Sequence, residues 1–246
     1  AVLSSDMDNT DKVIGFLEDV KGLGIKVLPP DINHSQSMFS VVEKGVIRYG
    51  LSAVKGVGQS AAQALVNARP KTGYQNLLEV CIEGDKVNKK LLESLIKCGA
   101  CDVLGENRAT LLASVEAALQ TCQQQSSDAL QGQQDLLGGE ITFSYKQANR
   151  MPKSLELQQE RETLGYYLTG HPVTECRKEL DGIGVKKVSA VTINNSGVRV
   201  AGVVNKIKVI KTKKGGRIAF VELSDDSGKI DIAFFDETYT NYYEIL

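Results

Sequence analysis

A glycine turn between two apolar segments is the first feature of the sequence that could do chemistry. Residues 51–65 read LSAVKGVGQSAAQAL, in which a short entry helix is separated from a second helix by two glycines around one valine. Glycine tolerates positive φ and has no side chain, so the N–H groups at the start of the second helix stay accessible. These amides and the positive end of the helix dipole suit a phosphate. The turn predicts contact with a DNA backbone, without reading of base sequence, through Lys55, Gly56, Val57, Gly58 and Gln59.

A basic strand followed by an aromatic residue forms the second group. Residues 198–217 contain seven Lys or Arg and no acidic residue. Period-two alternation puts Phe220 on the face opposite Ala219, Val221 and Leu223, where its ring either stacks on a base or packs under a loop. The basic residues are either a nucleic-acid surface or a solvated face, and we favour binding. The expected backbone contacts to single-stranded DNA come from Lys211, Lys213, Lys214 and Arg217.

A short peptide in a polar stretch is the third group. Residues 133–137 read QQDLL, between Gly132 and Gly138. The pentapeptide resembles the peptides by which bacterial replication and repair proteins dock on the sliding clamp, although matches of this length also arise by chance in glutamine-rich linkers. A few anchors would carry the affinity. The predicted clamp-binding residues are Gln133, Asp135, Leu136 and Leu137.

The cysteines and histidines do not indicate a catalytic or metal site. Cys98 and Cys101 form a CGAC sequence, but the chain offers no second ligand pair at a suitable spacing. We expect these thiols to pack as small apolar residues, and we predict neither a metal nor another cofactor in this chain. His171 has no carboxylate or nucleophile at a spacing that would orient it, so we interpret it as a turn histidine rather than an acid or base.

Composition limits what these groups can belong to. The chain has 246 residues, 42% of them apolar and 24% charged, with a net charge of -1. That length supports two modest domains, and the charge excludes a uniformly basic nucleic-acid coat. An odd number of cysteines, five, suits a reducing compartment, and no membrane-spanning run or signal peptide is visible, so we expect a cytoplasmic location without membrane contact.

The elements that position the glycine turn are mainly helical. Apolar periodicity predicts helices over residues 11–21, 59–68, 88–97 and 108–119, with Asn9 or Thr10 capping the first and Asn88 the third. A hairpin around Gly45 is predicted over residues 39–50. The sequence LLESLIKCGACDVLGENRATLL repeats helix, tight turn and helix, which indicates a tandem helix-hairpin-helix domain. Cys101 replaces the second glycine of this repeat, so we expect the second unit to be mostly structural.

The last fifty residues switch to strands. A first strand with a bulge near Asn205 and Lys206, a hairpin at residues 213–216, a second strand to Leu223, a turn at residues 225–228 and a third strand to Phe235 are typical of the first half of an OB-fold. The predicted fold class is multidomain α+β, a mainly helical tandem helix-hairpin-helix domain followed by an incomplete β-barrel.

The order of these parts resembles the bacterial replicative DNA polymerases of the C family, the DNA polymerase III alpha subunits. The resemblance covers nearly the whole chain, including AVLSSDMDNTDKVIGFLEDVKGLGIKVLPPDIN, YGLSAVKGVG and ERETLGYYLTGHP. It implies the end of a fingers region at residues 1–45, the tandem helix-hairpin-helix domain at 46–120, a linker with the clamp-binding peptide at 121–154, a helical connector at 155–190 and part of an OB-fold at 191–246.

The resemblance also implies a function. The family catalyses template-directed DNA synthesis with two magnesium ions on palm-domain aspartates. We expect those aspartates upstream of Ala1, in a longer parent chain, so that this piece is inactive by itself. It would bind duplex DNA, the sliding clamp and other holoenzyme subunits, and single-stranded DNA as a further partner.

Two alternatives remain open at this point. A DNA-repair or recombination factor could use the same hairpins for duplex DNA. An RNA-binding module, such as the anticodon-binding OB domain of an aminoacyl-tRNA synthetase, resembles RIAFVELSDDSG locally. The fingers-like start favours the polymerase over both.

Overall fold

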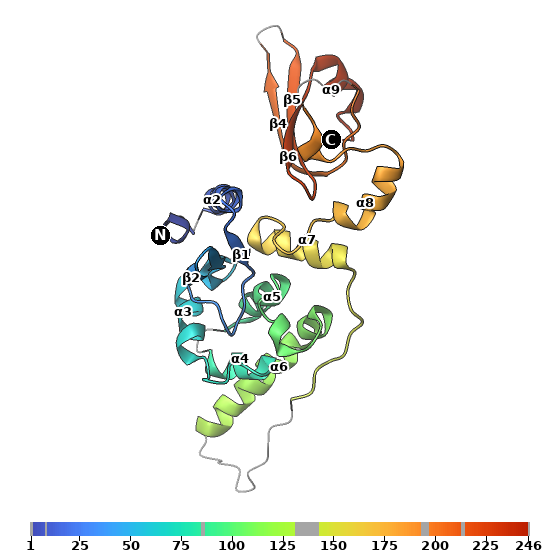
Figure 1. Cartoon of the computed structure of the whole chain (residues 1–246). Helices are drawn as coiled ribbons and strands as arrows, with labels where there is room; N and C mark the ends of the chain where they lie inside the picture. Colours follow the sequence, from blue (N-terminus) through green and yellow to red (C-terminus); the bar gives the residue numbers. More distant parts are fainter. Residues whose placement is uncertain are drawn as a thin grey trace. The chain divides into compact units, whose positions relative to one another are not determined.

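The computed structural model divides the chain into two compact units, Ala1–Thr169 and Gly170–Leu246 (Figure 1). It describes residues 2–7, 9–84, 87–130, 143–192, 197–212 and 215–245. The first unit consists, in chain order, of α1 (Val2–Ser5), α2 (Thr10–Gly22), β1 (Lys26–Leu28), β2 (Ser40–Glu43), β3 (Val46–Arg48), the 3-10 helix η1 (Leu51–Ala53), α3 (Gln59–Ala68), α4 (Leu77–Glu83), α5 (Lys89–Lys97), the 3-10 helix η2 (Asp102–Leu104), α6 (Arg108–Leu130) and α7 (Lys153–Leu164).

Asparagine caps fix where several helices of the first unit begin. The Asn9 side chain accepts a hydrogen bond from the Lys12 amide at 3.1 Å, so Asn9 rather than Thr10 caps α2. Asn88 accepts from the Leu91 amide at 3.0 Å and caps α5 as predicted. An N-cap of this kind satisfies one of the four N–H groups that a helix leaves unpaired, which contributes about 1 kcal/mol.

A small sheet precedes the glycine turn. Strand β2 pairs antiparallel with β3, and β1 joins the other side of β3 in parallel. Gly45 has φ +79° in the connection, which confirms the predicted hairpin. The chain then passes directly through Tyr49 and Gly50 into η1, so the sheet sets the entry to the turn.

The helices enclose one apolar core. Leu65, Leu92, Leu95, Ile96 and Leu111 are all fully buried. They come from α3, α5 and α6, the helices on either side of the two predicted hairpins. Burying one such side chain stabilises the fold by roughly 1.5–3 kcal/mol. Because the two helix-hairpin-helix units share this core, they form a single body.

The predicted linker is more structured at both ends than its composition indicated. Helix α6 continues past Leu119, where we expected it to end, to Leu130. After the residues that the structure does not describe, the Tyr145 hydroxyl accepts from the Leu77 amide at 2.9 Å, and the Ala148 amide donates to the Thr110 hydroxyl at 3.1 Å. Residues 143–148 therefore run along the helical domain, and α7 begins inside the stretch that we had assigned to the linker.

The second unit is built on an antiparallel sheet. Its elements are α8 (Val173–Gly182), the 3-10 helix η3 (Val188–Ala190), β4 (Val203–Lys211), β5 (Arg217–Ser224), β6 (Lys229–Phe234) and α9 (Asp236–Tyr242). The strand order is β4-β5-β6, and the β4–β5 register shifts between Val204 and Lys206, which confirms the predicted bulge. Within the described residues this sheet is three-stranded and does not close into a barrel, as expected for part of an OB-fold.

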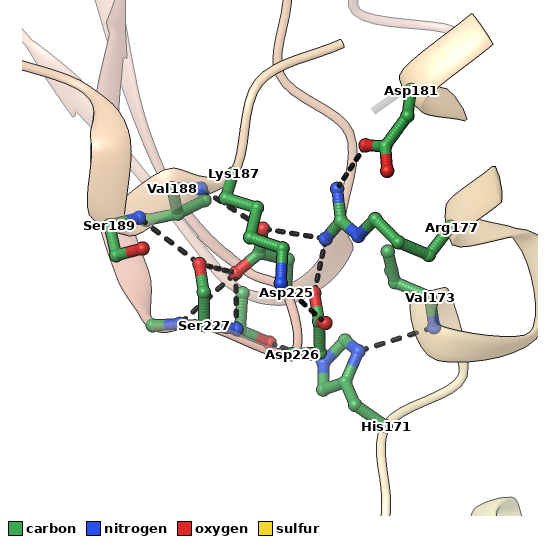
Figure 2. A network of polar contacts seen from close by, with 12 residues as sticks. His171, Val173, Arg177, Asp181, Lys187, Val188, Ser189, Asp225, Asp226 and Ser227 are labelled. Carbon is green, nitrogen blue, oxygen red and sulfur yellow. Dashed lines mark hydrogen bonds and ion pairs between the residues drawn. The ribbon is translucent and has the colours of Figure 1, made fainter.

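A polar network fastens α8 and η3 to the β5–β6 turn (Figure 2). One oxygen of the buried Asp225 carboxylate accepts from the Ser227 amide, the Ser227 hydroxyl and the Gly228 amide at 2.7, 2.6 and 3.0 Å. The other oxygen accepts from the Val188 amide at 3.0 Å and from Arg177 at 2.9 Å. Both oxygens of the Asp225 carboxylate therefore accept hydrogen bonds, and these bonds hold the β5–β6 turn in place.

These contacts change the acidity of Asp225. Burial by itself raises the pKa of this carboxyl, but the hydrogen bonds from Ser227, Val188 and Arg177 outweigh that effect and lower the pKa to about 2. Arg177 also contacts Asp226, and these hydrogen bonds raise the pKa of the guanidinium. Both partners therefore stay charged at neutral pH.

Candidate nucleic-acid interface

The predicted glycine turn lies between η1 and α3, and its two glycines differ. Gly56 has φ +87°, and a Cβ there would lie 2.7 Å from the Ser94 hydroxyl oxygen, so this position requires glycine. Gly58 has φ -68°, and a Cβ there would meet nothing within 4 Å. Val57, between them, is buried in the core. Neither the backbone conformation nor the surrounding space therefore requires glycine at position 58.

The amides that begin α3 are open. The Lys55 amide donates to the Thr163 carbonyl at 2.9 Å, and the Val57 amide donates to the Val54 carbonyl at 3.0 Å. Across the part of the chain that the structure describes, no acceptor faces the next four amides, and Gly58 supplies no capping side chain. These amides belong to Gly58, Gln59, Ser60 and Ala61. No acidic residue occupies the first turn of α3, so the helix end suits an anion.

The ERETLGYYLTGHP segment positions this turn from the other side. Glu160 on α7 is fully buried, and its carboxylate accepts from the Thr169 amide at 2.9 Å and from the Thr169 hydroxyl at 2.6 Å. Three residues further on, Thr163 holds the Lys55 amide. Glu160 thus holds the loop after α7 in place, and Thr163 connects the glycine turn to α7. Residue spacing in the sequence does not indicate the contact between Thr163 and Lys55.

Basic side chains flank the open amides. Lys55 and Gln59 are exposed, as expected. Lys90, in the first turn of α5, was missed by the sequence analysis: its Cε is 3.7 Å from the position that a Cβ on Gly56 would occupy. Lys90 is far from the turn in sequence, and the packing of α5 brings it close. The turn therefore contains one lysine, Lys55, and has a second, Lys90, beside Gly56.

The second hairpin has the same glycine geometry, but an arginine side chain covers its turn. Gly99 has φ +85°, and the guanidinium of Arg108 lies over it, where a Cβ would be 2.3 Å from Nη2. Arg108 is 6% exposed and donates to the Asp102 carboxylate at 2.9 and 2.8 Å and to the Lys97 carbonyl at 3.3 Å. The arginine closes this turn, which agrees with the structural role expected for the second unit.

The basic strand of the second unit presents two different faces. Residues directly opposite on paired strands share a face, and Phe220 pairs with Lys208 of β4 and Ala233 of β6. Phe220 is 40% exposed, so its ring is open rather than packed under a loop. Lys208, which the sequence analysis did not single out, is the cation beside it.

Lys211 and Arg217 pair with each other but not with Phe220. Their register places them on the face of Val209 and Ala219, opposite the aromatic ring. The residues predicted to contact single-stranded DNA therefore divide between the two faces of the sheet, because alternation along a strand sends neighbouring side chains to opposite faces. Lys213 and Lys214 lie outside the described residues.

The remaining candidate groups divide between described and undescribed parts of the chain. Gln133, Asp135, Leu136 and Leu137, the predicted clamp-binding residues, lie outside the described residues. Cys98 and Cys101 are buried free thiols, and burial raises the pKa of Cys98 to about 12, so they pack as small apolar groups.

Neither a metal site nor a membrane span is visible where the structure describes the chain. His171 bonds to the Ser224 hydroxyl at 3.2 Å and accepts from the Val173 amide at 3.3 Å, which is a turn role. No group of three or more His, Cys, Asp or Glu that could hold a metal occurs among the described residues. None of the helices, over the same residues, is both long enough and apolar enough to span a bilayer.

Comparison with known proteins agrees with both parts of this geometry. Residues 24–111 match the helix-hairpin-helix motif family, and residues 198–246 match a family described as an OB-fold nucleic acid binding domain. The first match includes both hairpins, and the second includes β4, β5, β6 and α9.

Whole-chain relatives extend the agreement. The chain is 40% identical over 257 residues to DNA polymerase III subunit alpha of Vibrio cholerae, 38% over 259 residues to that of Escherichia coli K12, and 33% over 271 residues to that of Pseudomonas aeruginosa. All of this chain is covered in each case, but it spans only 22 to 23% of the relatives' length. The predicted resemblance is therefore confirmed: this chain is similar over its whole length to a segment of the DNA polymerase III alpha subunits, with a helix-hairpin-helix motif followed by an OB-fold domain.

Proposed function

We propose that this chain binds duplex DNA for a replicative DNA polymerase, with the turn at residues 55–59 as the phosphate-binding site. The observation that carries the proposal is the set of four open amides at the start of α3, flanked by Lys55 and Lys90. Backbone amides and a helix dipole hold a phosphate without reading bases, as a polymerase that copies any sequence requires.

Substitution of Gly58 tests this proposal with little risk to the fold. In Gly58→Asp, the new carboxylate would occupy the amides as an N-cap and repel phosphate, while α3 keeps its stability because Asp is a favoured cap. We expect duplex affinity to fall by about tenfold or more. Gly58→Ala adds only a methyl group in open space and should bind like the unsubstituted chain. Equal affinity of both variants, measured by fluorescence anisotropy, would exclude the turn from the interface.

A second nucleic-acid surface, for single-stranded DNA, is proposed on the β-sheet of the second unit. Its support is the exposed Phe220 ring beside Lys208. Stacking on a base predicts that Phe220→Ala loses about 1–3 kcal/mol of binding free energy with an unchanged salt slope. Neutralising Lys208, by contrast, should lower the slope by about 0.7. An unchanged affinity of Phe220→Ala would reject the stacking role.

Clamp binding and polymerase activity are proposed for the whole protein. The QQDLL peptide supports docking on a sliding clamp, and replacement of Gln133, Leu136 and Leu137 by alanine should abolish clamp pull-down while duplex binding persists. The relatives' name supports template-directed DNA synthesis as this activity. A cytoplasmic location and magnesium ions on residues elsewhere in the protein complete the proposal.

A further inference from the structure

We propose that Ser94 and Lys90 of α5 complete the phosphate site at the Gly56 turn, so that a helix of the second hairpin unit contributes directly to the DNA contact of the first. The proposal rests on the proposed function of that turn. It adds two residues that neither the glycine motif nor the basic strand indicated, and it identifies the ligand as a backbone phosphodiester of duplex DNA.

Ser94 is a mostly buried residue whose hydroxyl has no partner among the described residues. The residue is 8% exposed, and its Oγ lies 2.7 Å from the position that a Cβ on Gly56 would occupy. Among the described residues this Oγ makes no hydrogen bond, and it is not one of the side-chain atoms that are fully buried without a partner, so it stays accessible. A hydroxyl that has no protein partner and still reaches solvent can exchange its water for an oxygen of a bound phosphate.

The contrast with another helical serine supports this reading. A buried serine usually donates back to the carbonyl four residues earlier, and Ser114 on α6 does so, to Thr110 at 2.7 Å. Ser94 makes no such bond to Lys90 in the described part of the chain. Its hydroxyl instead lies against Gly56, the one residue of the turn whose missing Cβ gives it room. From there it can donate to a phosphate oxygen held at the turn.

Lys90 supplies the matching charge. It lies four residues before Ser94, on the same face of α5, and its Cε is 3.7 Å from the same point near Gly56. Among the described residues no carboxylate pairs with it, whereas its neighbour Lys89 is paired with Glu116. Lys89 is therefore a suitable control for Lys90, because the two residues are adjacent and carry the same charge but only Lys90 lies beside the turn.

The test measures duplex affinity against salt concentration for the whole 246-residue chain. Fluorescently labelled duplex DNA is the probe, and the variants are Ser94→Ala, Lys90→Ala and the control Lys89→Ala. We expect Ser94→Ala to bind about tenfold more weakly with an unchanged salt slope, because one hydrogen bond to a charged group is lost. Lys90→Ala should lower the slope by about 0.9, one counterion contact with duplex DNA. Lys89→Ala should bind like the unsubstituted chain.

The outcomes separate this inference from the proposed function. If Gly58→Asp loses binding while Ser94→Ala and Lys90→Ala behave like Lys89→Ala, the turn binds DNA but α5 does not contribute, and the inference is overturned. If Gly58→Asp binds normally, the turn itself is excluded. Ser94→Ala should be at least as stable as the unsubstituted chain in thermal unfolding, because the hydroxyl it removes has no partner. Lys90 is exposed, so its variant decides the matter even if Ser94→Ala fails to fold.

Discussion

The two hairpins of the first unit share the same glycine backbone geometry, but different side chains contact the two turns. Gly56 and Gly99 both have positive φ near +85°, and both lie in the tight connection between helical segments. Arg108 lies over Gly99, and its guanidinium donates hydrogen bonds to the Asp102 carboxylate and the Lys97 carbonyl. At Gly56 the neighbours are instead a lysine and an unpartnered serine. A cation beside a glycine turn therefore does not by itself indicate a phosphate site, because what the cation already binds decides the role.

The largest expected effect follows from removing the arginine that closes the second turn. Arg108→Ala leaves a cavity and an unpaired Asp102, and we expect the free energy of unfolding to fall by about 3 kcal/mol. Urea denaturation followed by circular dichroism measures this change. Lys55→Ala is the control, since Lys55 is exposed and its loss should leave stability unchanged. A stable Arg108→Ala variant with weakened duplex binding would place the second turn in the DNA interface and contradict its structural role.

The Asp225 turn extends the comparison to a third turn that an arginine closes. The folded-state pKa of about 2 lies below the usual value of about 3.9 for Asp, so the stabilisation is complete above about pH 5 and is lost as the pH falls toward 2. We expect a loss of about 2–3 kcal/mol over that range. Asp225→Asn should be less stable at pH 7, and its difference from the unsubstituted chain should shrink on acidification. A difference that is constant with pH would contradict the lowered pKa.

A smaller effect separates the two glycines of the open turn. Gly56→Ala forces positive φ on alanine and moves the Ser94 side chain, so we expect it to lose about 1–2 kcal/mol of stability. Gly58→Ala should be close to neutral, since its φ is ordinary and its surroundings are open. Thermal unfolding of the two variants measures the difference. Equal stability would mean that Gly56 is not held at positive φ for structural reasons.

Local patterns predicted much of this fold. Capping residues located the starts of α2 and α5, Gly45 located a hairpin, and the break in alternation at Asn205 and Lys206 located the β4 bulge. Period-two alternation also gave the correct exposed face for Phe220. The same alternation places Lys211 and Arg217 on the opposite face, as the β4–β5 register shows.

Other features depend on packing between distant segments. Lys90 and Ser94 reach the turn only because α5 packs beside it, and Thr163 fixes Lys55 from α7. The closure of the second turn by Arg108 likewise requires the helix after it to return over Gly99. The end of α6 was missed because a glutamine- and serine-rich segment carries no apolar period to mark it.

One titration tests the difference between the two turns most directly. Duplex DNA of arbitrary sequence is added to the isotopically labelled chain, and amide resonances are followed by NMR. The amides of Gly58, Gln59 and Ser60 should shift with the added duplex, to the same extent for unrelated sequences, while those of Gly99 and Ala100 stay in place. Unmoved amides at the first turn, or equal shifts at both, would contradict the assignment of the open turn as the duplex-binding site.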